Sequence, residues 1–377
     1  MVVLVLYPFY NQKALMHNFA LKLHDYGIDV DAICINNFYF EKLSAVEWPN
    51  LIRRVFSYSF NSKSQFISRV IRKLSYSWLI KRLLKDYDIV DFHAYYPIYN
   101  ALMKECVDNQ IKFDITLWGS DLMRASDAEK QLLEFGFDNC YLIKMSDSLH
   151  SSMLESYGTK YEGKSRIAYF GNSDFPIIDK LTDIDSNSIK QNLYGSVVGK
   201  RIVVLGYNGI SSQNHLSMLK AIGCLSLEEK QMIHVALPMT YGAQNAYIDD
   251  VRVVADELGI SYTIFDRFLT IEEIAVIRKT ADIVVNVQNT DALAGSLQDH
   301  LYCGNVCIFG EWLKYDYYTN NGIYYIKTSM DELTTHIKEV LHNYDKYRQL
   351  CANNKSRINN LLSWESTILN QVAIYDE

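Results

Sequence analysis

The sequence predicts an α/β protein of two domains, each with a parallel sheet that helices cover on both faces. Three observations predict this class. Short apolar segments of strand length alternate with helical patterns along both halves of the chain, and such alternation is typical of parallel sheets. The 377 residues exceed what one ordinary hydrophobic core accommodates. A polar stretch from Gly171 to Ser188 interrupts the alternation near the middle of the chain.

The predicted domain boundaries follow from that interruption. Residues 1–172 form the first domain, 173–198 a linker, 199–358 the second domain, and 359–377 a C-terminal helix that returns to the first domain. Strands of the first domain are expected at Val2–Leu6, Val30–Ile35, Ile89–His93, Asp114–Leu117, Cys140–Ile143 and Arg166–Tyr169. Strands of the second are expected at Arg201–Gly206, Ile233–Leu237, Tyr262–Phe265, Ile283–Val287, Val306–Phe309 and Ile323–Ile326.

Composition agrees with globular domains. Apolar residues make up 49% of the chain and charged residues 21%, which excludes disordered, collagen-like and disulfide-scaffold classes. The cysteines lack the paired spacing of a zinc site, and the N-terminus lacks the charged start of a signal peptide, so we expect reduced thiols in a cytoplasm. No apolar run reaches the roughly 18 residues of a membrane-spanning helix.

The segment from Leu51 to Lys85 concentrates positive charge. It is rich in lysine and arginine and has no acidic residue, although the whole chain has a formal net charge of -7. From Phe66 onward its apolar residues follow helical spacing, and a basic face opposite an apolar face is typical of a helix lying on an anionic membrane. The residues expected to contact the membrane or an acceptor are Arg69, Arg72, Lys73, Trp78, Lys81 and Arg82. The alternative is a surface helix packed on its own domain. Nucleic acid is not an expected partner, because the rest of the chain is acidic and has no recognised binding motif.

The most informative motif is Asp291-Ala-Leu-Ala-Gly-Ser-Leu-Gln-Asp299, which follows the apolar strand Ile283–Val287. A buried strand leads into a short loop and then into a helix that starts with the small residues Gly295 and Ser296. Free backbone N–H groups at a helix start suit a diphosphate, so Gly295 and Ser296 are predicted to bind one. The two carboxylates suit hydroxyl groups, of a sugar at Asp291 and of a ribose at Asp299. The alternative for Asp299 is a capping box with Ser296.

A second loop follows the strand Arg201–Gly206. This loop is small and polar, so it can wrap a phosphate. The residues predicted to contact the same ligand, the donor that carries the diphosphate, sugar and ribose, are Gly206, Asn208, Ser211 and Ser212. Arg267, after the third strand of this half, is the candidate for a positive charge beside the diphosphate, with a surface role as the alternative. An aromatic ring and an open backbone at Tyr241 and Gly242 are predicted to contact the sugar or the base, with a core or turn role as the alternative.

Two residues of the first domain are candidates for a general base. Trp118-Gly-Ser-Asp121 follows the strand Asp114–Leu117, so the Asp121 carboxylate is placed at a carboxyl end of the sheet. His93, at the end of the preceding strand, is the second candidate. The alternatives are that Asp121 caps the following helix and that His93 is structural.

No metal and no cofactor are expected. The pairs Asp29-Val-Asp31 and Asp183-Ile-Asp185 match Asp-x-Asp, but the first flanks an early strand and the second lies in the predicted linker. Neither lies where a metal-dependent transferase holds its diphosphate.

The paired acids and the following Cys303-Gly304 resemble the Glu-x7-Glu element of glycosyltransferases with the GT-B fold, with aspartate in place of both glutamates. Three segments further resemble the bacterial transferases that add 4-acetamido-4,6-dideoxygalactose (N-acetylfucosamine type) to a lipid-linked glycan. They are Gly206-Tyr-Asn-Gly-Ile-Ser-Ser-Gln-Asn-His215, Leu237-Pro-Met-Thr-Tyr-Gly-Ala-Gln-Asn-Ala-Tyr-Ile248 and Leu117-Trp-Gly-Ser-Asp121.

This resemblance implies the fold and the function. It implies two Rossmann-like domains facing a central cleft, and a glycosyltransferase of hexosyltransferase type whose donor is a nucleotide sugar. The implied acceptor is a lipid-linked or growing bacterial surface polysaccharide, and the implied location is cytoplasmic and peripheral on the inner face of the cell membrane. A nucleotide-sugar epimerase and a catalytically silent GT-B scaffold are the alternatives. The resemblance does not specify base, sugar, acceptor, oligomeric state or stereochemical outcome, since the larger Glu-x7-Glu families retain configuration and the transferases named above invert it.

Overall fold

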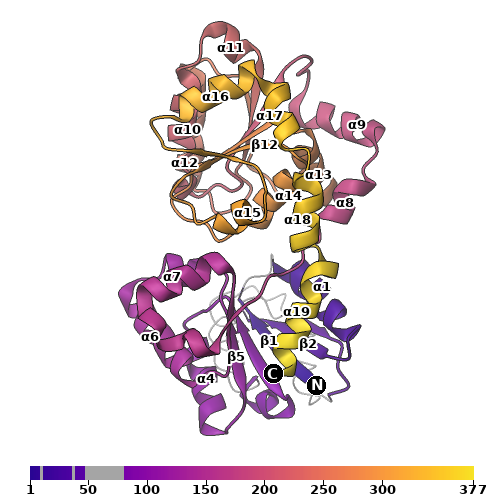
Figure 1. Cartoon of the computed structure of the whole chain (residues 1–377), viewed down its shortest axis with the longest axis vertical. Helices are drawn as coiled ribbons and strands as arrows, with labels where there is room; N and C mark the ends of the chain where they lie inside the picture. Colours follow the sequence, from indigo (N-terminus) through magenta and orange to yellow (C-terminus); the bar gives the residue numbers. More distant parts are fainter. Residues whose placement is uncertain (9–11, 36–38, 47–79) are drawn as a thin grey trace, which may run out of the picture. The chain divides into compact units, whose positions relative to one another are not determined.

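The structure is a computed structural model that describes residues 1–8, 12–35, 39–46 and 80–377. The chain divides into two compact units, shown in Figure 1. The first comprises Met1–Gly171 together with Thr367–Glu377, and the second comprises Asn172–Ser366. The last segment of the chain therefore belongs to the first unit.

The first unit is built on a seven-stranded sheet of order β3-β2-β1-β4-β5-β6-β7. All neighbouring strands are parallel except the edge strand β3, which is antiparallel to β2. The strands are β1 (Val2–Tyr7), β2 (Asp29–Cys34), β3 (Tyr39–Lys42), β4 (Ile89–His93), β5 (Phe113–Thr116), β6 (Ile143–Met145) and β7 (Ser165–Ile167). The central strands β1 and β4 are almost completely buried, as expected for a parallel sheet with both faces covered.

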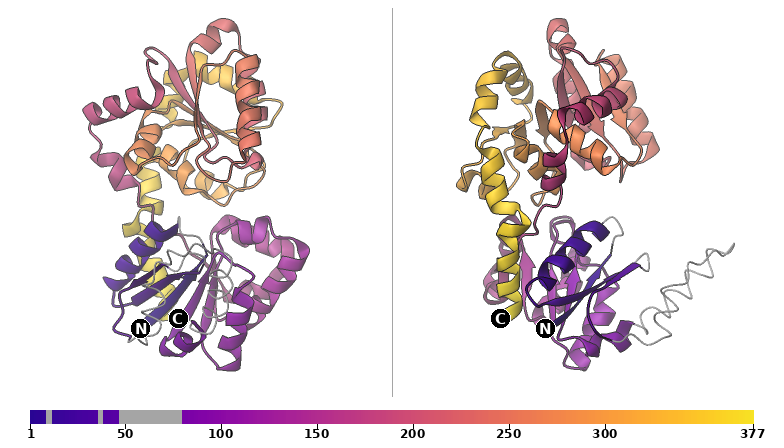
Figure 2. Two further views of the ribbon diagram at one scale, coloured as in Figure 1. Left: turned by 180° about the vertical axis from the view of Figure 1, so that it is seen from behind. Right: turned by 90° about the vertical axis from the view of Figure 1, so that its right-hand side faces the viewer.

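Helices cover both faces of this sheet (Figure 2). They are α1 (Lys13–His24), α4 (Tyr99–Asp108), α5 (Ser120–Met123), α6 (Asp127–Asn139) and α7 (Asp147–Tyr157), with short 3-10 turns at Leu84–Asp86 and Gly158–Lys164. The C-terminal helix α19 (Trp364–Asp376) belongs to this unit through its part beyond Ser366. There Gln371 donates to the carbonyl of Tyr169, and Tyr375 donates to Asp91.

The second unit has a six-stranded, fully parallel sheet of order β10-β9-β8-β11-β12-β13. Its strands are β8 (Arg201–Leu205), β9 (Ile233–Pro238), β10 (Tyr262–Phe265), β11 (Ile283–Asn286), β12 (Val306–Gly310) and β13 (Ile326–Thr328). Its helices are α8 (Phe175–Lys180), α9 (Asp183–Tyr194), α10 (His215–Gly223), α11 (Leu227–Gln231), α12 (Asn245–Glu257), α13 (Ile271–Thr280), α14 (Gly295–Tyr302), α15 (Asp316–Asn320), α16 (Leu333–His342), α17 (Tyr344–Leu350) and α18 (Asn354–Leu362), with a 3-10 turn at Ser211–Gln213. A continuous apolar core lies between one face of the sheet and helices α10, α12 and α16.

Most predicted strands coincide with observed ones, and the differences have local causes. β6 continues through Lys144, which apolar patterning alone does not place inside a buried strand. Residues 173–198, expected as a linker, contain α8 and α9, and both helices belong to the second unit. The strand β3 was not predicted.

Among the residues that the structure describes, no helix is both long and apolar enough to cross a membrane.

Candidate functional site

The loop after β8 starts at a glycine that no other residue replaces easily. Gly206 has φ of +64°, in the left-handed region, and a Cβ there would lie 2.8 Å from Gln213 Oε1 and 3.0 Å from His215 Nε2. Its N–H donates to the carbonyl of Val285 on the neighbouring strand β11. The predicted residue is therefore required to start the loop close to the carboxyl end of the sheet.

Amide side chains hold this loop in place. Asn208 is buried and accepts from the N–H of Ile210 (2.9 Å), which closes a turn within the loop itself. Gln213 accepts from the N–H of Tyr207 (3.1 Å) and donates to Gln288. Asn208, predicted to contact the donor, thus directs its amide oxygen into the protein, whereas Ser211 is exposed and Ser212 is partly exposed.

The loops after β8 and β9 pack closely against each other. Gly209 donates to the carbonyl of Tyr241 (2.8 Å). A Cβ on Gly209 would lie 2.2 Å from the Cβ of Ala243, and a Cβ on Gly242 would lie 2.5 Å from Ile210 Cγ1. Gly242, predicted to contact the ligand, is therefore needed for loop packing, while the Tyr241 side chain is 46% exposed.

We expect Gly209→Ala to destabilise the second unit by about 1–3 kcal/mol, because the added methyl group overlaps Ala243. Gly295→Ala is the matched control, since a Cβ at Gly295 meets nothing within 4 Å. Differential scanning calorimetry of the two variants checks this prediction. A Gly209→Ala variant as stable as Gly295→Ala would contradict the packing of the two loops.

Asp291 is held by three protein donors. Its side chain is buried, with 7% exposure, and Oδ1 accepts from the hydroxyl of Tyr207 (2.8 Å). Oδ2 accepts from the hydroxyl of Tyr315 (2.5 Å) and from the N–H of Ala294 (3.0 Å). Burial and the neighbouring carboxylate raise the pKa of both tyrosines, so the phenols stay protonated and donate. In this structure Asp291 fixes the loop that leads into α14, and its predicted contact with sugar hydroxyls stays a prediction.

The start of α14 is open to solvent. The preceding Leu293 has φ of +61°, an unfavourable region for leucine, and Gln298 stabilises it by donating to its carbonyl (2.8 Å). Gly295 is exposed, and the first-turn N–H groups of Gly295 and Ser296 have no partner within the helix. Ala294 precedes the helix without any side-chain cap, so the capping box between Ser296 and Asp299 is not formed. The predicted diphosphate position is thus accessible.

Asp299 faces inward rather than toward this open helix start. It is 1% exposed, accepts from Asn172 Nδ2 (2.8 Å) and lies 3.5 Å from Arg278 Nε on α13. Arg278 also donates to Ser296 Oγ (2.8 Å) and to His300 Nε2 (2.9 Å). Asp299 and Arg278 together fasten α14 to α13 and to the beginning of the second unit, and the predicted ribose contact stays a prediction.

Burial and the nearby Asp174 raise the pKa of Asp299 to about 7, and burial also raises the pKa of Asp174. Because the folded pKa is above the unfolded one, the contribution of Asp299 to stability is full below about pH 4 and is lost as the pH rises through 7. We expect the wild type to lose on the order of 2 kcal/mol of unfolding free energy between about pH 5 and pH 8. Asp299→Asn should lose less over the same range, which urea unfolding at each pH measures. Parallel curves for the two proteins would rule out this titration.

Three polar side chains near the loop after β8 keep unsatisfied groups. Among the described residues, His215 Nε2, Gln288 Nε2 and both amide atoms of Asn286 are buried without a hydrogen-bond partner. Burial lowers the pKa of His215 to about 4, so its imidazole is neutral. Such groups are costly unless water or a ligand meets them, and His215 and Gln288 adjoin the loop that Gly206 begins.

Arg267 does not face this loop. It is exposed and forms an ion pair with Glu273 in the first turn of α13, with contacts of 2.5 and 2.9 Å. Arg267 follows the edge strand β10 and is paired with Glu273, which fits the surface alternative. Its role beside a diphosphate stays a prediction.

Asp121 in the first unit organises the backbone around it. Its carboxylate is buried and accepts from the N–H groups of Gly119 (2.8 Å), Trp118 (3.0 Å) and Tyr95 (3.1 Å). Burial raises the pKa of Asp121, and these backbone donors oppose that rise. These donors lie upstream of α5 rather than in its first turn, so Asp121 fixes the loop between β5 and α5 and does not cap the following helix. Its role as a general base stays a prediction.

His93 is likewise enclosed. It is 1% exposed, surrounded by the rings of Phe19, Trp118 and Phe170, and its Nε2 lies 3.0 Å from Asp91 Oδ2. Burial opposes ionisation of Asp91, but His93 and Lys144 hold the pKa of Asp91 well below its usual range. The structural alternative for His93 therefore fits, and the role of general base stays a prediction.

The predicted membrane or acceptor residues are mostly outside the described part of the chain. Arg69, Arg72, Lys73 and Trp78 lie in residues 47–79, which the structure does not describe. Lys81 forms an ion pair with Glu105 on α4 (2.7 Å), and Arg82 is exposed.

No protein-family model and no curated protein sequence matches the chain. Solved structures match all of it. A glycosyltransferase from Rickettsia africae has a TM-score of 0.73 at 14% identity, with 100% of this chain and 97% of that chain covered. HepE of Anabaena, in complex with UDP and glucose, has a TM-score of 0.74 at 11% identity, with 100% and 99% covered. Sucrose-phosphate synthase of Thermosynechococcus elongatus has a TM-score of 0.73 at 10% identity, with 100% and 98% covered. The chain has the GT-B fold.

In this GT-B chain, three residues that matter for the site were absent from the predicted set. Tyr207 and Tyr315 anchor Asp291, and Arg278 anchors Ser296 and Asp299. Tyr207 lies in a loop that the sequence marks as functional. Tyr315 and Arg278 come from elements whose pairing with Asp291 and Asp299 arises only from the folded arrangement of the second unit.

Within the described residues, no group of three or more histidine, cysteine, aspartate or glutamate side chains is arranged to hold a metal ion.

Proposed function

We propose that this GT-B protein is a glycosyltransferase that moves a sugar from a nucleotide diphosphate sugar to a hydroxyl of a lipid-linked or growing surface glycan. The carboxyl edge of the second sheet carries the proposal, because the open first turn of α14 lies there. The unsatisfied His215 and Gln288 beside the loop after β8 give a ligand further partners. Solved structures of similar fold add support, since HepE is bound to UDP in one crystal and to UDP-glucose in another.

The proposed diphosphate contacts are the N–H groups of Gly295 and Ser296 and the hydroxyls of Ser211 and Ser212. Donors already in place at a helix N-terminus stabilise the negative charge that develops on the leaving diphosphate. Asp291 would not touch the sugar in this proposal; it would keep the start of α14 in position. We propose a metal-independent reaction, because helix N–H groups and neutral side chains can supply these contacts.

The acceptor side of the proposal rests on sequence. The basic segment that includes Arg69, Arg72 and Lys73 would bind an anionic membrane on its cytoplasmic face and so place the enzyme near a lipid-linked acceptor. The three segments that resemble bacterial 4-acetamido-4,6-dideoxygalactose transferases favour this acceptor class over a free sugar.

Thermal-shift measurements with the diphosphates of uridine, thymidine, guanosine, adenosine and cytidine test the donor site, since a ligand that binds only the folded protein raises the midpoint. We expect one or two of them to stabilise the protein, and no response to any would favour a silent scaffold. The matching nucleotide sugars are then incubated with and without membrane extract as acceptor. Release of nucleoside diphosphate only with extract supports a transferase, whereas conversion of the sugar without extract would support an epimerase.

A further inference from the structure

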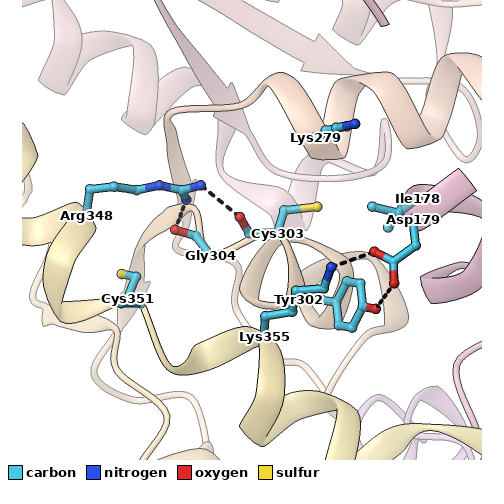
Figure 3. Close-up of a pocket in the computed structure, with 10 residues that line it drawn as sticks. Ile178, Asp179, Lys279, Tyr302, Cys303, Gly304, Arg348, Cys351 and Lys355 are labelled. Carbon is cyan, nitrogen blue, oxygen red and sulfur yellow. Dashed lines mark hydrogen bonds and ion pairs between the residues drawn. The ribbon is translucent and has the colours of Figure 1, made fainter. Parts of the chain in front are cut away.

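A pocket of about 640 Å³ opens on the second unit, away from the donor loops. Its lining comes from α8, the end of α13, the end of α14, α17, α18 and the turns beside them (Figure 3). The residues are Ile178, Asp179, Lys279, Tyr302, Cys303, Gly304, Arg348, Cys351, Ala352 and Lys355. Because α13 ends just before β11 and α14 ends just before β12, the pocket lies at the amino ends of these parallel strands. The donor loops lie at their carboxyl ends.

The charges of this pocket do not balance. Lys279, Arg348 and Lys355 line it, and Asp179 is the only carboxylate among the described residues that line it, which leaves a formal charge of about +2. Burial raises the pKa of the Cys303 thiol to about 12 and that of the Cys351 thiol to about 11, so neither contributes a negative charge. The cations reach the pocket from three different helices, α13, α17 and α18.

Each of the three cations has a protein partner, and Lys355 and Arg348 keep further hydrogen-bonding capacity. Lys279 donates to the carbonyl of Leu181 (2.6 Å). Lys355 donates to Asp179 (2.6 Å), which accepts from the Tyr302 hydroxyl (2.6 Å) as well, as Figure 3 shows. Arg348 donates to the carbonyls of Gly304 and Cys303 at the end of α14. An ammonium has three N–H donors and a guanidinium has five, so donors on Lys355 and Arg348 exceed the acceptors named here.

Size and lining narrow the class of ligand. A volume of about 640 Å³ exceeds that of an inorganic ion and suits a small organic molecule. The exposed Ala352 supplies apolar surface beside the cations, whereas Ile178 and Tyr302 are each only 4% exposed. A phosphate monoester carries a charge of about −1.5 to −2 at neutral pH and several strong acceptor oxygens, which matches both the charge and the free donors.

We propose that this pocket binds a small phosphate monoester, at a site separate from the donor loops. The phosphate would lie among Lys279, Arg348 and Lys355, with its organic part against Ala352. Because α14 runs from the donor loop to this pocket, a ligand there would contact the far end of the helix that the proposed diphosphate meets. The binding itself does not depend on the proposed glycosyltransferase activity.

Isothermal titration calorimetry with phenyl phosphate at about pH 8, where the ester is a dianion, tests the proposal on the full chain. Lys355→Met should weaken binding about tenfold, equivalent to the loss of about 1.4 kcal/mol, and Lys355→Glu should abolish it. Lys346→Met is the matched control, because Lys346 is an exposed lysine on α17 that does not line the pocket. Circular dichroism establishes that each variant is folded.

Binding that persists in Asp291→Asn would place the site away from the donor loops, as proposed, whether or not nucleoside diphosphates bind. Two outcomes overturn the proposal. One is the absence of binding up to about 10 mM phenyl phosphate, a concentration beyond any specific weak site. The other is equal affinity in the wild type, Lys355→Met and Lys355→Glu.

Discussion

Replacing Asp291 by Asn is expected to lower kcat/KM for the nucleotide sugar by about a hundredfold or more while the protein stays folded. The carboxylate accepts hydrogen bonds from the hydroxyls of Tyr207 and Tyr315 and from the N–H of Ala294. The asparagine side chain keeps one acceptor oxygen, but its NH2 group would face a tyrosine hydroxyl that is itself a donor. Displacement of the loop by about 1 Å at the start of α14 is enough for a loss of that size.

Tyrosine variants separate positioning from direct contact with the sugar. Tyr315→Phe leaves the Asp291 carboxylate in place and removes one of its donors, so a positioning role predicts that activity falls in this variant too. A sugar contact by Asp291, as first expected from the sequence, predicts instead that Tyr315→Phe stays fully active. Asp316→Asn is the control, because Asp316 follows directly in the chain but its side chain is 74% exposed. Steady-state kinetics and nucleotide affinity are measured for all three variants.

The strands were the most predictable part of this fold. β4 and β10 have the predicted bounds, because each is a short and mostly apolar segment of strand length. β6 was shifted because Lys144 lies inside it, and the charge is tolerated only where Asp91 and Asp114 from neighbouring strands meet it. A contact of this kind joins three strands, so local patterning does not reveal it.

The site was predictable in position but not in side-chain direction. The motif from Asp291 to Asp299 correctly placed a loop and a helix start at the carboxyl edge of a parallel sheet. Whether a carboxylate in such a motif faces solvent or protein depends on groups from other elements. Tyr315 follows β12 and Arg278 lies on α13, and these two residues draw Asp291 and Asp299 inward.

Lys144→Met is expected to lower the unfolding free energy of the first unit by about 3–5 kcal/mol, because it leaves the buried carboxylates of Asp91 and Asp114 without their cation. Lys144 is 1% exposed, and its ammonium lies 2.5 Å from Asp91 and 3.2 Å from Asp114. Tyr375 of the C-terminal helix also donates to Asp91 (2.5 Å), so the loss should loosen this helix. Urea unfolding measures the effect. Lys160→Met is the control, since Lys160 pairs with Glu134 and Asp138 at the surface and should leave the unfolding midpoint close to that of the wild type.

The stability of the Lys144→Met variant should change with pH in a direction that a simple loss of packing would not produce. In the wild type the pKa of Asp91 is depressed, so its contribution to stability is present above the unfolded pKa of about 4 and is lost only as the pH falls below that value. His93 still lowers the pKa of Asp91 in the variant, but Asp114 loses the cation that opposes its burial. Without Lys144 the already raised pKa of Asp114 rises further, so folding favours its protonated acid. The variant should therefore become more stable relative to the wild type as the pH falls from about 8 to 5. If the difference in unfolding free energy between the two proteins is constant over this pH range, Lys144 acts through packing alone. The buried carboxylates beside it would then not depend on the charge of Lys144.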